Sequence, residues 1–257
     1  MTSVHPTAIV AEGAELGADV EIGPYCIVGP NVSIGDETRL MSHVVLDGFT
    51  RLGSRCTVFP FACIGTQTQD LKYKGDKTSV EIGDGTTLRE YVTVNSATNE
   101  GEVTSVGTGC HIMAYSHVAH ACRVGDEVIM ANCATLAGEV VVEDQAILGG
   151  LSAVHQFVKI GRLCMTGGCT KVTQDCPPFM IVDGNPANVR GVNVIGLERR
   201  GVDAGARKLL KLAYKILYRE GLSTSQAVDR IRAEIPGSPE VDHLVSFIES
   251  SERGIVK

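Results

Sequence analysis

The sequence predicts a mainly β protein, in which a parallel β-helix of hexapeptide repeats is followed by a small α-helical domain. Three observations lead to this fold class: an aliphatic residue at every sixth position, a composition poor in aromatic residues, and a change to helical periodicity near the C-terminus. We expect the β-helix to span residues 1–190, with two inserted loops at 66–79 and 95–105, and the helical domain to span residues 191–257.

The six-residue repeat runs from Val4 to Val172. Of its 29 positions, four are not aliphatic, namely Asp70, Asp76, Glu100 and Thr166. A period of six fits neither an α-helix nor a strand alone, but it is the repeat of parallel β-helices. Each hexad is therefore expected to form one short strand and one corner.

This run of hexads resembles that of the left-handed hexapeptide-repeat family, which implies a left-handed β-helix with three hexads, or 18 residues, per coil. Residues 18 apart should then lie above one another at the spacing of paired strands, about 4.8 Å. Both loops consume whole hexads, so the β-helix should continue beneath them. Long excursions from a rigid scaffold often carry function. We expect a function for the first loop, with its Gln69, Asp70 and Lys72, and make no assignment for the second.

Composition supports a narrow prism. Aromatic residues make up 5% of the chain, Trp is absent and Gly numbers 29. Glycines directly after the aliphatic positions, such as Gly17 and Gly35, are expected to supply the permissive backbone of the corners. Of the nine Cys, five lie two residues before a position of the six-residue repeat, and we interpret them as small interior residues rather than as disulfides or metal ligands: Cys26, Cys56, Cys110, Cys122 and Cys164.

The charge distribution bears on partners and location. A net charge of −7 argues against a general nucleic-acid-binding protein. Residues 186–220 nevertheless hold eight Lys or Arg against three acids, which indicates either one acidic partner or a solvated helix face. The chain shows neither the pattern of a signal peptide nor a run of about 20 apolar residues that could form a transmembrane segment. We therefore expect a soluble, cytoplasmic protein.

The repeat is expected to end near Pro177 and Pro178, because proline cannot continue strand pairing. An extended stretch should follow, and then three amphipathic helices. The second helix begins at Ser223 or Thr224 and the third at Pro239. The first helix carries an apolar face of Leu209, Leu212, Ala213, Ile216 and Leu217.

The spacing of 18 suggests where chemistry could occur. It places His120, Gly138 and Gln156 in one column, so that an imidazole lies beside a bare backbone N–H and a carboxamide. Imidazole can accept a proton near neutral pH, and an exposed N–H can hold the oxyanion of a tetrahedral intermediate. These are the groups that acyl transfer to a hydroxyl needs. A thioester donor is already activated, so neither a nucleophilic Ser or Cys nor a cofactor is expected.

A metal site is the alternative for the same histidines. His117 and His120 form an HxxH pair, which is compatible with zinc. A third ligand is hard to find, because His155 lies beside the column of His120 and two coils away. We therefore favour catalysis without a metal.

Several motifs together resemble the UDP-N-acetylglucosamine O-acyltransferases of lipid A biosynthesis over essentially the whole chain. They are HPTAIV, IGPYCIVGP, QDLKYKG, HVAHAC, TLAG, VHQF, GNPA and GLERRG. The resemblance implies transfer of an (R)-3-hydroxyacyl group from acyl carrier protein to the 3-hydroxyl of UDP-N-acetylglucosamine. It also implies a homotrimer with active sites between subunits, and an acidic carrier protein would explain the basic zone.

The resemblance also implies roles for particular residues. His120 matches the general base of that family and Gly138 its oxyanion donor. The remaining matches fall into three groups. Those near the sugar and phosphates are His117, Gln69, Asp70 and Lys72, and those that hold the UDP portion are Gln156, Asn193, Arg199 and Arg200. Those that line the acyl channel are His155 and Gly168.

Three positions depart from the family pattern. Ala121 stands where an aspartate usually follows the base and orients it, and Glu139 stands where a histidine usually follows the oxyanion glycine. Because these positions are 18 apart, our hypothesis is that Glu139 reaches His120 and replaces the missing carboxylate.

Ile195 stands where a sugar-contacting glutamate is common. Two alternatives therefore stay open: an N-acyltransferase that uses a 3-amino UDP-sugar, and a UDP-sugar-binding scaffold that has lost catalysis.

Overall fold

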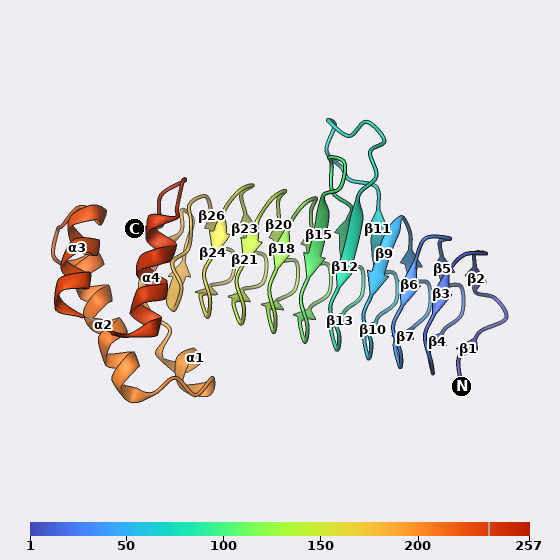
Figure 1. Ribbon diagram of the computed structural model, residues 1–257, viewed down its shortest axis with the longest axis horizontal. Coiled ribbons are helices and arrows are strands. Elements are labelled where there is room, and N and C mark those ends of the chain that lie inside the picture. The colour runs from blue at the N-terminus through green and yellow to red at the C-terminus, as the bar shows by residue number, and fades with distance from the viewer. Residues whose placement is uncertain (236) are drawn as a thin grey trace.

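The computed structural model describes residues 1–235 and 237–257, and it confirms a left-handed parallel β-helix that ends in a cluster of helices (Figure 1). Three sheets form the sides of a triangular prism. Paired strands join residues 18 apart, for example Val4 with Ile22 and Val10 with Val28. The predicted stacking of successive coils is therefore correct.

The strands alternate between the three sheets in chain order. Sheet A contains β1 (Ser3–Val4), β4 (Glu21–Ile22), β7 (Arg39–Leu40), β10 (Thr57–Val58), β13 (Thr87–Leu88), β16 (His111–Ile112), β19 (Ile129–Met130), β22 (Ile147–Leu148), β25 (Met165–Thr166), β27 (Met180–Asp183) and β28 (Asn188–Val192). Sheet B contains β2 (Ile9–Val10), β5 (Ile27–Val28), β8 (Val45–Leu46), β11 (Cys63–Thr66), β14 (Thr93–Asn95), β17 (His117–Val118), β20 (Thr135–Leu136), β23 (Ala153–Val154) and β26 (Lys171–Val172). Sheet C contains β3 (Glu15–Leu16), β6 (Ser33–Ile34), β9 (Phe49–Leu52), β12 (Ser79–Ile82), β15 (Val103–Val106), β18 (Arg123–Val124), β21 (Val141–Val142) and β24 (Lys159–Ile160).

The aliphatic residue of each hexad points into the prism. Leu46, Leu88 and Leu136 are fully buried, and each ends a strand whose preceding residue faces outward. Their burial is the main source of stability, because apolar area removed from water contributes about 25 cal/mol per Å². The five cysteines expected inside are also buried, with at most 1% of each exposed.

The corner glycines have a different purpose from the one expected. The left-handed corner positions are held by other residues, such as Tyr25 (φ 59°) and His43 (φ 59°), whereas Gly17 and Gly35 are not among the residues with positive φ. These glycines lie where the next coil comes closest: a Cβ on Gly35 would be 2.6 Å from the carbonyl carbon of Gly53. Close stacking, and not backbone conformation, therefore excludes a side chain there.

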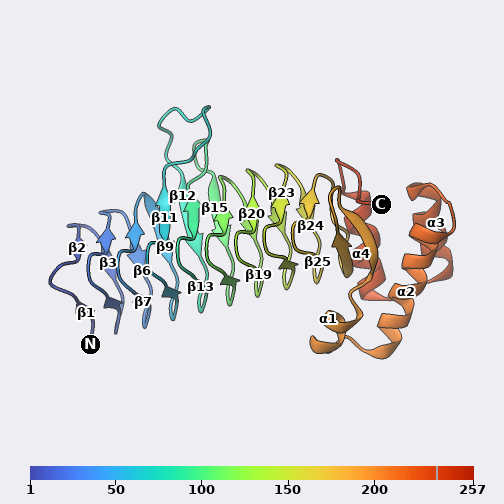
Figure 2. The same ribbon diagram turned by 180° about the vertical axis from the view of Figure 1, so that it is seen from behind.

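Two loops leave the prism on one side (Figures 1 and 2). They join β11 to β12 and β14 to β15, so residues 67–78 and 96–102 lie outside the strands. The strands that flank them extend slightly into the expected loop ranges. Below the loops the register is kept, since Leu52 pairs with Ile82 and Val94 with Val118. The prediction that both loops consume whole hexads is confirmed.

Strand pairing continues past the two prolines, contrary to expectation, but the spacing of 18 is lost, since Thr166 pairs with Val182. β27 pairs in parallel with β25, and β28 then adds an antiparallel strand. Pro178 lies in a turn before β27 rather than within a strand. Proline is tolerated at such a position because no strand hydrogen bond is needed from its nitrogen.

Four helices follow the last strand. They are α1 (Val194–Arg199), α2 (Ala204–Arg219), α3 (Thr224–Glu234) and α4 (Pro239–Glu249). α1 lies in the stretch that we expected to be extended. Ser223 caps α3 in a capping box and α4 begins at Pro239, as predicted. On α2 the expected face is partly wrong: Leu212 is 39% exposed, while Leu210 is buried. Among the described residues no helix has the length and apolar character of a membrane span.

The two ends of the prism differ. At the C-terminal end the helices and the last coil share a second apolar core that includes Leu163, Phe179 and Leu210. At the N-terminal end the first coil has a neighbour on one side alone, and Val4 is 45% exposed. The β-helix is therefore closed at one end and open at the other.

We expect Gly35→Ala to lower the free energy of unfolding by about 1–3 kcal/mol, because the added methyl group would be forced against the backbone of the next coil. Denaturant unfolding followed by circular dichroism measures this. Gly191→Ala is the matched control, since a Cβ at Gly191 meets nothing within 4 Å. Equal stability of the two variants would contradict the close-approach explanation.

Candidate active site

The candidate site lies on one edge of the prism, where the chain passes from sheet B to sheet C. We call this edge BC, and name edges AB and CA in the same way. Here His120 follows β17 and Gly138 follows β20, one coil further on. A Cβ built on Gly138 would overlap the imidazole ring of His120. The N–H of Glu139 donates to the carbonyl oxygen of His120 (2.9 Å). The predicted stacking of His120 and Gly138 is thus present.

Gly138 contributes more than space for the ring. Within residues 1–235 and 237–257 its N–H donates to no recorded acceptor, although its carbonyl oxygen accepts the N–H of Phe157 at 3.1 Å. A free backbone N–H beside an imidazole is the arrangement needed to hold an oxyanion next to a general base.

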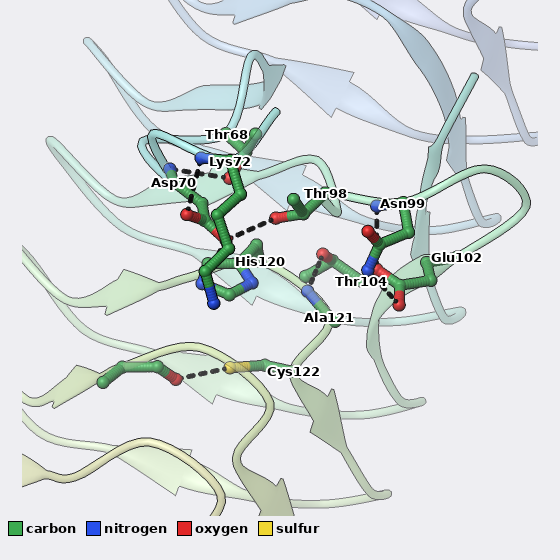
Figure 3. A network of polar contacts seen from close by, with 11 residues as sticks. Thr68, Asp70, Lys72, Thr98, Asn99, Glu102, Thr104, His120, Ala121 and Cys122 are labelled. Carbon is green, nitrogen blue, oxygen red and sulfur yellow. Dashed lines mark hydrogen bonds and ion pairs between the residues drawn. The ribbon is translucent and has the colours of Figure 1, made fainter. Parts of the chain in front are cut away.

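The first loop brings a carboxylate to the same place. Oδ2 of Asp70 lies 4.0 Å from Nε2 of His120, and each side chain is 19% exposed. The backbone N–H of Lys72 donates to Asp70 Oδ1 (3.0 Å) and the Thr98 hydroxyl donates to Asp70 Oδ2 (3.2 Å), as Figure 3 shows. The carboxylate is thus tethered on both oxygens and faces the ring.

The same contacts affect the protonation of Asp70. The hydrogen bond from the Lys72 N–H, helped by the Thr98 hydroxyl and by the nearby charges of His120 and Lys72, holds the pKa of Asp70 below its usual value. Asp70 is therefore ionised at neutral pH.

The second loop holds the first in place, a role that we had not assigned. Nε2 of Gln69 donates to Oδ1 of Asn95 at 3.2 Å, and Nδ2 of Asn95 donates to Oγ1 of Thr66 at 3.0 Å. Asn95 and Thr98 are 5% and 4% exposed. Both were missed because short polar residues in a loop give no sequence signal of burial. The loops form one unit above His120.

His117 lies on β17, three residues before His120. Its Nδ1 is 2.7 Å from Oγ1 of Thr93 on the neighbouring strand β14. Burial, together with the charge of His120, lowers the pKa of His117. It is therefore a neutral ring of fixed orientation at the wall of the site. Among the described residues no group of three or more His, Cys, Asp or Glu is placed to hold a metal ion.

Glu139 does not make the contact that we expected. It is exposed, and its carboxylate has no hydrogen bond or ion pair in the described part of the chain. It lines a cavity of about 670 Å³ with Ala121 and Arg123. The reason is the corner geometry: with φ 60° it belongs to the column of Ala121 (φ 54°), next to that of His120. Asp70 is the carboxylate paired with His120 here.

Two further predicted residues lie higher on edge BC. Gln156 occupies the next corner above Gly138, as the spacing of 18 predicts. His155 precedes it, with Nδ1 3.5 Å from Nη2 of Arg253 in the C-terminal segment. They extend the site along the edge and away from the two loops.

The remaining predicted residues are not brought to His120 within one chain. Gly168 lies on edge AB. Asn193 is buried, caps α1 and donates from Nδ2 to the carbonyl of Leu163 at 3.0 Å. Arg200 pairs with Glu127 on edge CA, and Arg199 ends α1 beside it. Figure 1 shows α1 on the opposite side of the prism from the loops.

Comparisons with known proteins give a consistent result. A family model described as the second domain of UDP-N-acetylglucosamine O-acyltransferase matches residues 175–256, and a bacterial transferase hexapeptide model matches residues 13–48 and 104–138. The chain is similar to the acyl-[acyl-carrier-protein]–UDP-N-acetylglucosamine O-acyltransferases of Thermodesulfovibrio yellowstonii (50% identity) and Thiobacillus denitrificans (47%), with 100% of each chain covered.

Solved structures agree with these relatives. The UDP-N-acetylglucosamine acyltransferase of Bacteroides fragilis matches with a TM-score of 0.97 and 39% identity, over 99% of this chain and 100% of that one. The acyltransferase of Acinetobacter baumannii matches with a TM-score of 0.95 and 43% identity, over 99% of each chain. Full-length identity of this order, together with the shared fold, shows that the chain belongs to the UDP-N-acetylglucosamine O-acyltransferase family.

Proposed function

We propose that this protein transfers an (R)-3-hydroxyacyl group from acyl carrier protein to the 3-hydroxyl of UDP-N-acetylglucosamine, the first step of lipid A biosynthesis. The observation that carries the proposal is the stacking of His120 on Gly138, whose N–H has no recorded acceptor in the described chain. The names of the full-length relatives supply the donor and the acceptor.

The chemistry follows from these two groups. His120 accepts the proton of the acceptor hydroxyl as its oxygen attacks the thioester carbonyl carbon. The N–H of Gly138 holds the negative charge that develops on the carbonyl oxygen. When the intermediate collapses, the carbon–sulfur bond breaks and the protonated His120 returns the proton to the departing thiolate. The products are an ester and the free thiol of the carrier arm.

Side chains around the column suit the two substrates. Lys72 and His117 lie on the loop and wall beside His120, where a sugar nucleotide would place its hydroxyl and phosphates. Lys208, Lys211 and Lys215 are exposed on α2, and among the described residues none of the three forms an ion pair. Such a row of free cations favours docking of an acidic protein such as a carrier protein.

The homotrimer is part of the proposal, and the outer face of sheet B supports it. The outward-facing residues of its first eight strands carry no formal charge if His is neutral: Ile9, Ile27, Val45, Cys63, Thr93, His117, Thr135 and Ala153. Sheet C, in contrast, presents charged residues such as Glu15, Arg51 and Arg123. An uncharged strip beside His117 is suited to packing against further copies, since interface cores are depleted of charge.

Edge AB adds to this surface. Five rings are stacked along it with centroids 4.8–5.0 Å apart, those of Tyr25, His43, Phe61, Tyr91 and Tyr115. Tyr25 and Tyr115 are each 58% exposed. Protein interfaces are enriched in aromatic residues and depleted of charged ones, so exposed rings next to an uncharged face indicate an interaction site. In the proposed trimer, residues from neighbouring copies complete the site, because one chain leaves Gly168 and Arg200 on other edges.

We expect His120→Ala to lower kcat by about 10²–10⁴-fold, because it removes the general base. A radiolabelled-product assay with acyl carrier protein and UDP-N-acetylglucosamine measures the loss, and sedimentation checks that assembly is unchanged. His111→Ala, in which an outward-facing residue of β16 is replaced, is the matched control. Retained activity in His120→Ala would refute the proposed base, and binding of UDP-sugar without turnover by the unaltered protein would indicate a non-catalytic scaffold.

The acceptor atom is tested by competition. Ile195 is 64% exposed on α1 and offers no carboxylate to a sugar. We expect the ester product to dominate when UDP-N-acetylglucosamine and its 3-amino analogue compete at equal concentration. The amounts of ester and amide, measured by mass spectrometry, give the ratio of kcat/KM for the two acceptors. A ratio in favour of the amide would identify an N-acyltransferase instead.

We expect Ile27→Arg to dissociate the trimer, because it places a charge within the uncharged strip. Sedimentation equilibrium then gives the mass of one chain. Ile129→Arg is the control, since Ile129 also faces outward but lies on sheet A. A trimer that withstands Ile27→Arg, or that is disrupted equally by both changes, would count against sheet B as the interface.

A further inference from the structure

The residue next to His120 offers it no carboxylate, because residue 121 is alanine. We infer that Asp70, on the first inserted loop, is the positioning residue of His120 and stabilises its cationic form during acyl transfer. The inference rests on the proposed function, which names His120 as the base.

Geometry supports Asp70 first. Its Oδ2 approaches Nε2 of His120 to 4.0 Å, and both side chains are largely enclosed. Hydrogen bonds from the Lys72 N–H and the Thr98 hydroxyl fix one oxygen each. Thr98 is itself 4% exposed, so this anchor is held in the second loop. The carboxylate is preorganised before any substrate binds, as an electrostatic contribution to catalysis requires.

The other charged groups near His120 are less suited to this task. Glu102, in the second loop, has both oxygens engaged by Asn99, through its N–H (3.0 Å) and its side chain (2.8 Å). Glu139 lines the cavity beside Ala121. Lys72 is an exposed cation, and His117 is held neutral by burial. Figure 3 shows Asp70 above the ring and the Asn99–Glu102 pair to the side.

The electrostatic effect is reciprocal. The charge of His120 contributes to the lowered pKa of Asp70. The same interaction free energy must then favour the imidazolium when Asp70 is ionised. The proton that His120 takes from the acceptor hydroxyl creates that imidazolium, so an anion at this distance stabilises the charge that forms in the transition state. Asp70 acts through the ring and transfers no proton itself.

Asp70→Asn tests the inference, because the charge is lost while the shape is kept: the amide oxygen can still accept from the Lys72 N–H, and the amide NH2 can donate to the Thr98 hydroxyl. We expect kcat to fall by about 10²-fold, with a smaller change in KM for UDP-N-acetylglucosamine. A fall in kcat with KM nearly unchanged is the result that a role in sugar binding alone would not produce. Asp76→Asn, in the same loop, is the matched control.

A rescue experiment separates this role from sugar binding. Residue 121 has φ 54°, a conformation that aspartate adopts more readily than alanine. We expect the double variant Asp70→Asn with Ala121→Asp to have a kcat at least about tenfold higher than that of Asp70→Asn alone, because a carboxylate then stands on the residue next to His120. A carboxylate that merely bound the sugar would not be replaced in this way.

The outcomes are separable. If the unaltered protein transfers no acyl group, the proposed function fails. If the unaltered protein is active and Asp70→Asn keeps its kcat, the inference is overturned while the proposed function stands. The inference is also overturned if Asp70→Asn raises KM alone, or if Glu139→Gln lowers kcat and Asp70→Asn does not.

Discussion

The whole structure depends on one constraint, the close stacking of successive coils. Strands of neighbouring coils must lie about 4.8 Å apart, so that their backbones can hydrogen-bond, along all three sides of the prism at once. Where the backbone itself comes closest, as at Gly35, no side chain fits. At Gly138 the same lack of a side chain admits the ring of His120. At this corner the glycine is therefore needed for the proposed active site, whereas at Gly35 it is needed for the stacking of the coils.

The prism and the column could be predicted from sequence because both follow from a fixed repeat. Once the period was known, the spacing of 18 placed His120 beneath Gly138 without any knowledge of side-chain contacts. The loops could not be derived in this way. Their residues have no period, so the clamp of Asn95 on Gln69 and of Thr98 on Asp70 depends on contacts between segments 26 and 28 residues apart.

Other differences have equally local causes. The helix α1 was missed because it has only 6 residues, too few to show a helical period. Its N-cap, Asn193, had been assigned to ligand binding instead. Glu139 was expected to reach His120 because it lies 18 residues after Ala121, the neighbour of His120, but the corner separates neighbouring residues into two columns. Spacing along the chain predicts which corner a residue occupies. It does not predict which way a corner side chain points.

The site combines residues of the β-helix with residues of the inserted loops. His120 and Gly138 belong to the coils, whereas Asp70 is held by hydrogen bonds from Lys72 in its own loop and from Thr98 in the second loop. Residues of the two kinds face one another across the space where the acceptor would bind. This division suits an enzyme that must keep its base and oxyanion donor aligned while it admits a large nucleotide sugar.

The open first coil has a consequence for how the molecule comes apart. A stack of repeats in which each contacts its neighbours behaves as a one-dimensional chain, and it frays from an end that lacks a cap. The helices cover the C-terminal end, so we expect this chain to open around Val4 first and then one coil at a time. His120 and its two loops lie several coils inward. Thermal fluctuations at the open end can therefore expose the first strands repeatedly while the catalytic corner keeps its register.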